Sequence, residues 1–364
     1  MESKQTVFPA HVLSGAGVIR QLGGLCARYG RRALLIGGVR ALAAVRDAVG
    51  ASLRQADVEL AGCEAYGGEC SKINIDRLSA QVRTLRADVL IVAGGGKALD
   101  CGKAVGEAAA CPVITLPTIA ATCAAVTPLS VLYQDDGHYC DLLHLAQAPA
   151  GVVIDSQLLA GAPLRWLAAG LGDTLAKWYE YRAIRHGEAL DGRVMAAQAN
   201  SRICFELIER FGAEACRGAA QGQATPALEQ VLDAIFLFAA LTSIMGSGNH
   251  AAASHGLFEG FTVCDKTRDF GHGLLVGYGN LCLLALEQRS DEELLDALRL
   301  ARECHIPLTL AAIAADLSEQ EKEAIMRAAV ATPDMANMAQ PVSLHQLAQA
   351  MARVDALAAG LDAA

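Results

Sequence analysis

The sequence predicts an α/β domain built on a parallel sheet, followed by a domain made only of helices. A chain of 364 residues is long enough for about two domains. Short, β-branched apolar runs alternate with helical periods in its first part, and only helical periods remain in the rest. We therefore expect an α/β dinucleotide-binding domain over residues 1–160 and an all-helical metal-binding domain over 161–364.

Short apolar runs mark the expected strands of the first domain. They are residues 32–38, 88–93, 112–117 and 151–155. Runs this short and this uniformly apolar are typical of strands buried on both faces of a sheet. Helical periods at 75–85 and 99–109 complete the strand–helix alternation that favours a parallel sheet.

Long stretches with helical period fill the second half of the chain. They are residues 164–184, 193–211, 227–245, 273–286, 291–304, 318–331 and 343–357. Glycines and prolines separate them. The join at 160–163 is short, so we expect the two domains to pack around a cleft, which is a favoured place for ligands.

Composition excludes several classes of protein. Hydrophobic residues make up 53% and charged residues 19% of the chain, which argues against disorder. With 30 Lys and Arg against 39 Asp and Glu, the net charge is -9, which disfavours binding to nucleic acid or anionic membranes.

Compartment is predicted from the cysteines and the apolar segments. The 12 cysteines include no CxxC pair and are expected to be reduced thiols of a cytoplasmic protein. The N-terminal residues 1–5 lack the apolar region of a signal peptide. The apolar stretch 234–245 is shorter than the roughly 20 residues of a bilayer span, so we expect a buried core helix.

A glycine-rich loop, Gly94-Gly95-Gly96-Lys97, follows an expected strand and opens an expected helix. Glycines there allow backbone N–H groups to approach a phosphate, and the helix N-terminus favours an anion. The alternative is a tight turn without a ligand. The loop matches neither the P-loop nor the common GxGxxG fingerprint, so a variant dinucleotide site is left open.

Asp173, His255 and His272 are candidate metal ligands in the helical half. One carboxylate and two imidazoles match a catalytic divalent site that keeps an open position. Taken singly, each has a simpler interpretation: a helix N-cap, a core histidine and a turn residue. On spacing alone, His250 is an equal candidate.

The glycine loop and these three residues, in this order, resemble the iron-containing (group III) alcohol dehydrogenase superfamily, and within it the glycerol dehydrogenase-like branch. The resemblance rests on GGGKALDCGKA at 94–104, LPTIAAT at 116–122, TPLSVLY at 127–133 and GDTLAKWYE at 172–180. The last motif, with residues 120–125, is most similar to the hydroxycarboxylate dehydrogenase A subgroup, which reduces 2-oxo acids with NADPH.

The resemblance implies a dehydroquinate synthase-like fold, a homo-oligomer, and site residues of both domains. Asp173, His255 and His272 would hold the catalytic metal, with zinc favoured over iron. The implied cofactor contacts are Gly94, Gly95, Gly96 and Lys97 on the pyrophosphate, with Thr118, Thr127, Leu129 and Tyr133 along the rest of the cofactor.

Three positions depart from the family pattern. Cys123 stands where glycerol dehydrogenases have an aspartate that contacts the polyol, so we expect Cys123 at the substrate. A neutral thiol removes an acceptor for glycerol and a charge that would repel an acid. Phe258 replaces a family histidine and Leu275 a family lysine, which alters proton relay or substrate anchoring.

Cofactor choice is predicted from the segment 37–40. An acidic residue after the first strand would accept from the ribose 2′-OH of NAD. Here the segment has no acid and contains Arg40, which can pair with a 2′-phosphate or simply begin a solvated helix. The segment favours NADP(H) over NAD(H).

We therefore expect a metal-dependent oxidoreductase that transfers a hydride between NAD(P)(H) and a small 2-oxo or 2-hydroxy acid, with the metal as Lewis acid. Such an enzyme needs a small-molecule carbonyl or alcohol partner, and neither a nucleic acid nor a membrane. The alternatives are a glycerol or other polyol dehydrogenase, a lyase on the same fold, and a binding protein that has lost turnover.

Overall fold

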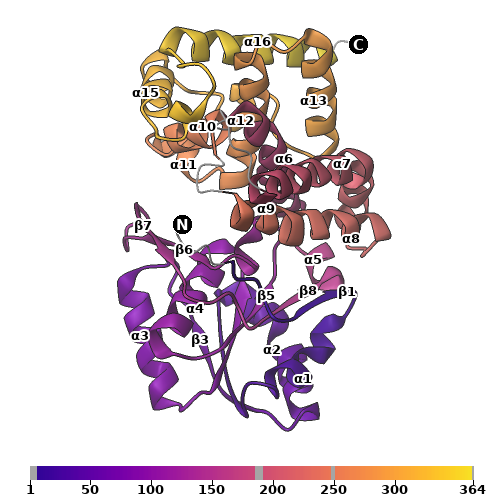
Figure 1. Ribbon diagram of the computed structural model, residues 1–364, viewed down its shortest axis with the longest axis vertical. Helices are drawn as coiled ribbons and strands as arrows, with labels where there is room; N and C mark the ends of the chain where they lie inside the picture. The colour runs from indigo at the N-terminus through magenta and orange to yellow at the C-terminus, as the bar shows by residue number, and fades with distance from the viewer. Residues whose placement is uncertain (1–5, 185–191, 247–250, 363–364) are drawn as a thin grey trace. The chain divides into compact units, whose positions relative to one another are not determined.

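The computed structural model describes residues 6–184, 192–246 and 251–362 (Figure 1). The chain divides into two compact units. The N-terminal unit contains Met1–Pro163 and Gly218–Thr225, and the C-terminal unit contains Leu164–Arg217 and Pro226–Ala364. The sequence pattern contains no sign that the short segment Gly218–Thr225 returns to the first unit.

The N-terminal unit is built on a six-stranded, wholly parallel sheet with the order β1-β8-β5-β4-β2-β3. Its strands are β1 (Val12–Gly15), β2 (Arg32–Gly37), β3 (Glu59–Ala65), β4 (Val89–Gly94), β5 (Val113–Pro117) and β8 (Gly151–Asp155). Every residue of β4, β5 and β8 is buried. The predicted parallel α/β domain is confirmed.

Helices cover both faces of this sheet (Figure 1). The helical elements are η1 (Val18–Gln21), α1 (Leu22–Cys26), α2 (Val39–Gln55), α3 (Lys72–Thr84), α4 (Gly96–Ala109), η2 (Cys123–Ala125) and α5 (Ser156–Ala160). Val45, Val49 and Leu53 of α2 pack into one core with Leu35 and Ile91 of the sheet. A separate antiparallel hairpin follows η2 and consists of β6 (Leu129–Tyr133) and β7 (Tyr139–His144).

Sequence patterning predicted the four central strands and missed β1, β3 and the hairpin. The two missed strands of the main sheet are its two edges. An edge strand is buried less than a central one, and β3 reads ELAGCEA with no fully buried residue. The apolar run that reveals a doubly buried strand is therefore absent from it.

The C-terminal unit is mostly helical, as predicted. Its helices are α6 (Leu164–Ala183), α7 (Gly192–Ala220), α8 (Pro226–Asp233), α9 (Ala239–Met245), α10 (Ala253–Phe261), α11 (Asp265–Arg268), α12 (His272–Leu286), α13 (Asp291–Glu303), α14 (Leu310–Ile313), α15 (Glu319–Val330) and α16 (Leu344–Asp362). A π-helical turn, η3 (Ala234–Phe238), joins α8 to α9, and a 3-10 turn, η4 (Met335–Asn337), precedes α16.

One helical segment has the length and composition of a membrane span. The apolar stretch 234–245 belongs to a helical run of 20 residues, Pro226–Met245, whose most apolar 18-residue window has a mean hydropathy of 1.6. The apolar stretch alone is too short to cross a membrane, but by length and composition the whole run suffices. Half of its most apolar window is buried inside the protein, and core helices meet the same two criteria.

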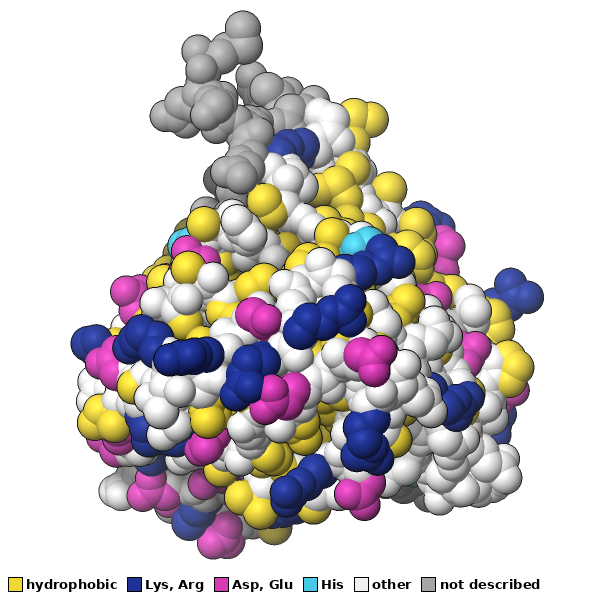
Figure 2. Space-filling view, turned by 90° about the horizontal axis from the view of Figure 1, so that it is seen from below, with side chains coloured by type: hydrophobic (Ala, Val, Ile, Leu, Met, Phe, Trp, Pro, Cys, Tyr) yellow, Lys and Arg dark blue, Asp and Glu magenta, His cyan; other side chains and the backbone are white. Residues whose placement is uncertain are grey.

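The surface mixes charges of both signs with single apolar side chains. Figure 2 shows basic and acidic side chains interspersed with apolar ones over the face in view. Large exposed apolar side chains come from different elements, including Val39 of α2, Tyr139 of β7 and Met195 of α7. Single exposed apolar residues are normal on soluble proteins. The homo-oligomer implied by the family stays a prediction.

Helices α6 and α12 touch backbone to backbone. A Cβ atom added to Gly172 of α6 would lie 2.3 Å from the carbonyl oxygen of Gly273, and one added to Gly273 would lie 2.0 Å from that of Ala169. The buried side-chain amide of Asn280 also donates to the carbonyl of Gly172 at 2.9 Å. Only glycine permits this approach, and it places the residue after Gly172 beside the start of α12.

A second close contact joins α10 to α12. A Cβ atom on Gly279 of α12 would lie 2.6 Å from the backbone oxygen of Ser254 on α10. On its other side, α10 meets α15, where a Cβ atom on Gly260 would lie 2.6 Å from the carbonyl oxygen of Ile325. Asp173, His255 and His272 directly adjoin the glycines and the serine of these contacts.

Replacing Gly273 with alanine tests the close contact of α6 with α12. The added methyl group meets backbone that cannot turn aside, so Gly273→Ala should lower the free energy of unfolding by about 1–3 kcal/mol. Urea denaturation followed by circular dichroism measures the change.

The matched control is Gly360→Ala in α16, because no described atom outside the helix lies within 4 Å of a Cβ atom built there. That variant should be neutral or up to about 1 kcal/mol more stable than wild type. Equal stability of Gly273→Ala and Gly360→Ala would contradict this account of the contact.

Candidate functional site

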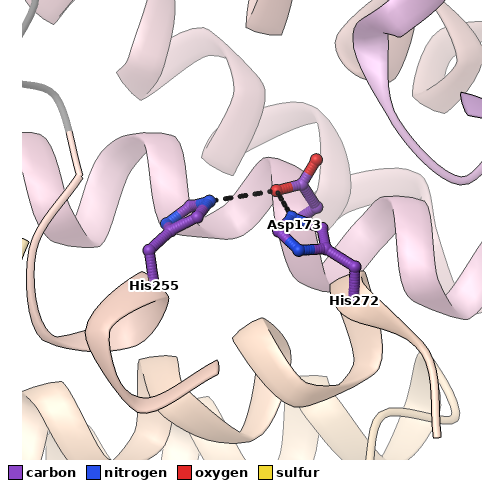
Figure 3. A group of neighbouring side chains, drawn as sticks. All are labelled: Asp173, His255 and His272. Carbon is purple, nitrogen blue, oxygen red and sulfur yellow. Dashed lines mark ion pairs between the residues drawn. The ribbon is translucent and has the colours of Figure 1, made fainter. Parts of the chain in front are cut away.

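Asp173, His255 and His272 come from three helices and converge on one point (Figure 3). Asp173 lies within α6, His255 within α10, and His272 is the first residue of α12. The Nε2 atoms of His255 and His272 lie 3.5 and 3.4 Å from Oδ1 of Asp173. One ligand atom from each residue lies within 4.8 Å of the other two.

This donor set fits a divalent metal of borderline softness. Two ligands about 2.0–2.1 Å from a tetrahedral zinc ion lie about 3.3–3.5 Å from each other. Both distances from Asp173 Oδ1 are of that size. A carboxylate with two imidazoles suits zinc and also iron, and three protein ligands leave a position for a substrate or water. The group therefore has the chemistry and the spacing of a catalytic metal site.

The charge state of Asp173 suits a metal ligand. The residue is only 6% exposed. Burial raises the pKa of its carboxyl, but hydrogen bonds from His255 and His272 and the charge of Lys177 together hold that pKa well below its usual value. Asp173 is therefore an anion despite its burial.

Glu180 orients His255. Its carboxylate is completely buried, and Oε2 lies 2.6 Å from Nδ1 of His255. Oε1 accepts hydrogen bonds from the backbone N–H groups of Ala252 and His255, at 2.8 and 2.9 Å. Burial raises the pKa of Glu180, but His255 and these backbone donors lower it overall, so it accepts from Nδ1–H. Nε2 of His255 is then the nitrogen left to bind a metal.

The carboxylates of Glu180 and Asp173 also change the pKa of His255. Burial lowers the pKa of its imidazole, but Glu180 and Asp173 outweigh burial and raise that pKa to about 10. Glu180 ends the sequence motif GDTLAKWYE at 172–180, but the sequence alone suggested no role for it. Its spacing of seven residues from Asp173, two helical turns on one face of α6, is the signal that could have found it.

Two of the three departures from the family pattern, Phe258 and Leu275, differ in their surroundings. The ring of Phe258, one turn after His255 on α10, meets the ring of His272 edge to face at 4.2 Å between centroids. Leu275 is completely buried in the core. Of these two residues, Phe258 is the one in ring contact with a candidate ligand.

The sheet of the N-terminal unit has a topological switch point. After β2 the chain passes through α2 to β3 on one side, whereas after β4 it passes through α4 to β5 on the other. The carboxyl ends of β2 and β4 are therefore a switch point, where open α/β sheets bind ligands. Gly38 follows β2, and its backbone nitrogen lies 4.0 Å from a Cβ atom built on Gly94 at the end of β4.

The predicted phosphate loop lies at this switch point. Gly94 has a φ of +156° and a Cβ atom there would lie 2.6 Å from that of Ala98, so a side chain is excluded. Gly95 is the N-cap of α4, and no described side chain caps that helix end. The backbone N–H of Thr118, another predicted cofactor residue, donates to the carbonyl of Gly94 at 3.0 Å.

Lys97 already has an anionic partner. Its Nζ atom lies 2.6 Å from Oε1 of Glu69 and 4.9 Å from the ring centre of Tyr133, a further predicted cofactor residue. Glu69 follows β3, the edge strand that the sequence pattern did not reveal. A contact between such distant positions has no signature in one sequence.

Thr127 and Leu129, also predicted along the cofactor, are held by a buried ion pair of α4. Lys103 lies 2.9 Å from Oδ1 of Asp100 and is 2% exposed. Its ammonium donates to the backbone oxygens of Thr127, at 3.0 Å, and of Leu129. These hydrogen bonds tie the segment 127–129 to α4. Breaking the ion pair would leave a buried charge without a partner.

The remaining predicted residues lie in separate places. Arg40 is exposed as the second residue of α2, whose first turn contains no acidic residue. Cys123 is half-buried at the start of η2. His250, the competing metal candidate, lies outside the described residues.

Similarity to known proteins decides the family. A model of the family described as iron-containing alcohol dehydrogenase matches residues 9–156. A glycerol dehydrogenase of Escherichia coli is 35% identical over 309 residues, which are 83% of this chain and 83% of that protein. The chain belongs to the iron-containing alcohol dehydrogenase family, in its glycerol dehydrogenase-like branch. This confirms the resemblance read from the motifs.

Two further members bear on the fold and the reaction class. The crystal structure of a probable glycerol dehydrogenase from Sinorhizobium meliloti matches 98% of this chain and 99% of its own, with a TM-score of 0.83 and 28% identity. Hydroxycarboxylate dehydrogenase A of Escherichia coli is 34% identical over 257 residues, 70% of each protein. The chain is an NAD(P)-dependent alcohol or hydroxycarboxylate dehydrogenase, and identity alone does not separate those two substrate classes.

Replacing Glu180 with glutamine tests its hold on His255. The amide of Gln would donate to Nδ1, which forces the proton of His255 onto Nε2 and blocks that nitrogen as a ligand. Glu180→Gln should weaken zinc binding by about 10- to 100-fold, measured by competition with a chromophoric chelator.

The control is Glu206→Gln, because Glu206 is exposed on α7 and pairs with Arg202. Its zinc affinity should equal that of wild type. Unchanged affinity in Glu180→Gln would refute the orienting role.

Proposed function

We propose that this enzyme transfers a hydride reversibly between NADP(H) or NAD(H) and a small 2-oxo or 2-hydroxy acid. The observation that carries the proposal is the convergence of Asp173, His255 and His272 on one point, with Glu180 fixing the ring of His255. These residues would hold a divalent metal, zinc rather than iron. A metal held there would supply Lewis acidity toward a carbonyl, and the nicotinamide would carry the hydride.

The protein's own groups bind and orient in this proposal. Asp173 stays ionised in a buried place, and Glu180 keeps the proton of His255 on Nδ1. Hydride transfer needs no protein nucleophile. Phe258 has no ionisable group at the position of a family histidine, so we assign proton delivery to water or a cofactor ribose hydroxyl.

The cofactor would bind at the switch point of the sheet. Gly94, Gly95 and Gly96 would receive the pyrophosphate at the N-terminus of α4, where unpaired N–H groups favour an anion. Thr118 is hydrogen-bonded to this loop, and Lys103 fixes the segment of Thr127 and Leu129. Lys97 and Tyr133 would complete the set. Arg40, exposed in a helix turn without an acid, favours a 2′-phosphate and hence NADP(H).

Cys123 supports an acid substrate. Its neutral thiol would not repel the carboxylate of the substrate, and it offers the hydroxyl groups of a polyol no strong hydrogen-bond acceptor. The second candidate function is a glycerol or other polyol dehydrogenase, which the 35% identity to a glycerol dehydrogenase favours. Substrate preference separates the two.

The substrate assay tests the proposed function. Zinc-loaded protein should oxidise NADPH with 2-oxoglutarate or pyruvate faster than it reduces NAD with glycerol, and chelation should stop both reactions. His272→Ala should lose zinc and lower kcat/KM by more than about 100-fold, because losing a ligand costs more than losing its hydrogen-bond partner.

Absorbance at the NADPH band and zinc analysis of the same samples provide the measurement. Glycerol oxidation that exceeds every 2-oxo acid would select the polyol candidate. Full activity of a zinc-free His272→Ala protein would refute the metal site.

Arg40→Asp tests the cofactor preference. Losing a charge-assisted hydrogen bond of about 1.5–3 kcal/mol, and adding repulsion, should reduce kcat/KM for NADPH by about 10- to 100-fold and leave NADH unaffected. Arg46→Asp, an exposed change on the same helix, is the control. Equal changes for both cofactors would contradict recognition of the 2′-phosphate.

A further inference from the structure

Helix α6 carries a lysine at the metal site. Lys177 follows Asp173 by four residues and precedes Glu180 by three, so the three side chains share one face of α6. Lys177 is only 6% exposed. Lysine is among the residues least often buried, and a buried one without an ionic role is rare.

The charge of Lys177 affects the pKa values of groups in three parts of the C-terminal unit. On α6, it acts with the two histidines against burial in holding down the pKa of Asp173. On α10, its repulsion works with burial to lower the pKa of His255, which the carboxylates raise. Just before η4, burial raises the pKa of Asp334 while His255 and Lys177 oppose that rise. The ammonium therefore lies among the groups that surround the candidate metal.

The charges around Lys177 leave room for an anion. Asp173 and Glu180 are buried carboxylates on the same face of α6 as Lys177, and Asp334 is a half-buried carboxyl whose pKa is raised by burial. A divalent ion and Lys177 together would offset these three carboxylates, so a metal-loaded site would not repel an anion through net negative charge. An ammonium has three N–H donors and can keep a protein partner while it binds a ligand.

We infer that Lys177 binds the carboxylate of the substrate and so selects 2-oxo and 2-hydroxy acids over uncharged ketones and polyols. The inference rests on the proposed function and adds the group that recognises the acid. Its rival is a structural role, in which Lys177 only neutralises Asp173 and Glu180. Recognition of an anion should discriminate between substrates, whereas neutralisation should affect all substrates alike.

The test compares Lys177→Met and Lys177→Arg with wild type, all loaded with zinc. Pyruvate is the anionic substrate and dihydroxyacetone the uncharged one, with NADPH as reductant. A second readout without turnover is the binding of oxalate, measured by calorimetry, and zinc per chain is measured on every sample. Lys322→Met is the matched control, since Lys322 of α15 is partly exposed and pairs with Glu319.

Lys177→Met should raise KM for pyruvate and weaken oxalate binding by about 10- to 100-fold, the effect of losing a charged hydrogen bond. Its kcat/KM for pyruvate should fall by the same factor relative to its kcat/KM for dihydroxyacetone, both expressed per bound zinc. Lys177→Arg should recover part of the pyruvate affinity, and Lys322→Met should behave as wild type. These results together support the assignment.

Parallel losses with pyruvate and dihydroxyacetone at full zinc content would overturn the inference and leave the proposed function standing. If Lys177→Met cannot hold zinc, Lys177→Arg decides. A changed ratio of kcat/KM for pyruvate over dihydroxyacetone supports recognition, and an unchanged ratio overturns it. Wild type that reduces dihydroxyacetone but no 2-oxo acid would overturn both the proposed function and the inference.

Discussion

The site depends on the close approach of helix backbones in the C-terminal unit. Gly172 and Gly273 bring α6 and α12 into contact, and Gly279 brings α10 against α12 at Ser254. Each candidate ligand adjoins one of these residues in the chain, so the packing of small residues sets the spacing of the donors. A side chain at Gly172 or Gly273 would meet main-chain atoms, and the donors would separate with the helices.

Helix packing sets the spacing of the site, and electrostatic interactions compensate its buried charges. Asp173 and Glu180 are carboxylates buried on one face of α6, and such groups are costly unless they are paired. His255 lies between them, Lys177 lies on the same face, and a divalent ion would supply the remaining positive charge. The same arrangement accounts for the orientation of His255 and would favour the acid substrate that we propose.

A feature of the fold or the site can be predicted from the sequence only where it leaves a local pattern in the chain. Doubly buried strands such as β4 reveal themselves as apolar runs, whereas the edge strand β3 does not. The glycine loop was predicted from its place between strand and helix, and its position at the carboxyl end of β4 agrees. Residue type alone made Asp173, His255 and His272 weak candidate ligands, and only the family resemblance separated them from His250, because residues 173, 255 and 272 share no local spacing. Glu180 and Glu69 were missed because their roles arise from contacts with distant residues.

Anomalous X-ray diffraction from crystals of the zinc-loaded enzyme tests the central claim most directly. Data collected on both sides of the zinc absorption edge locate the metal independently of activity. We predict one peak in the C-terminal unit, about 2.0–2.2 Å from Oδ1 of Asp173 and Nε2 of His255 and His272. A peak bound by other residues, or no peak in crystals whose protein contains stoichiometric zinc, would contradict the account.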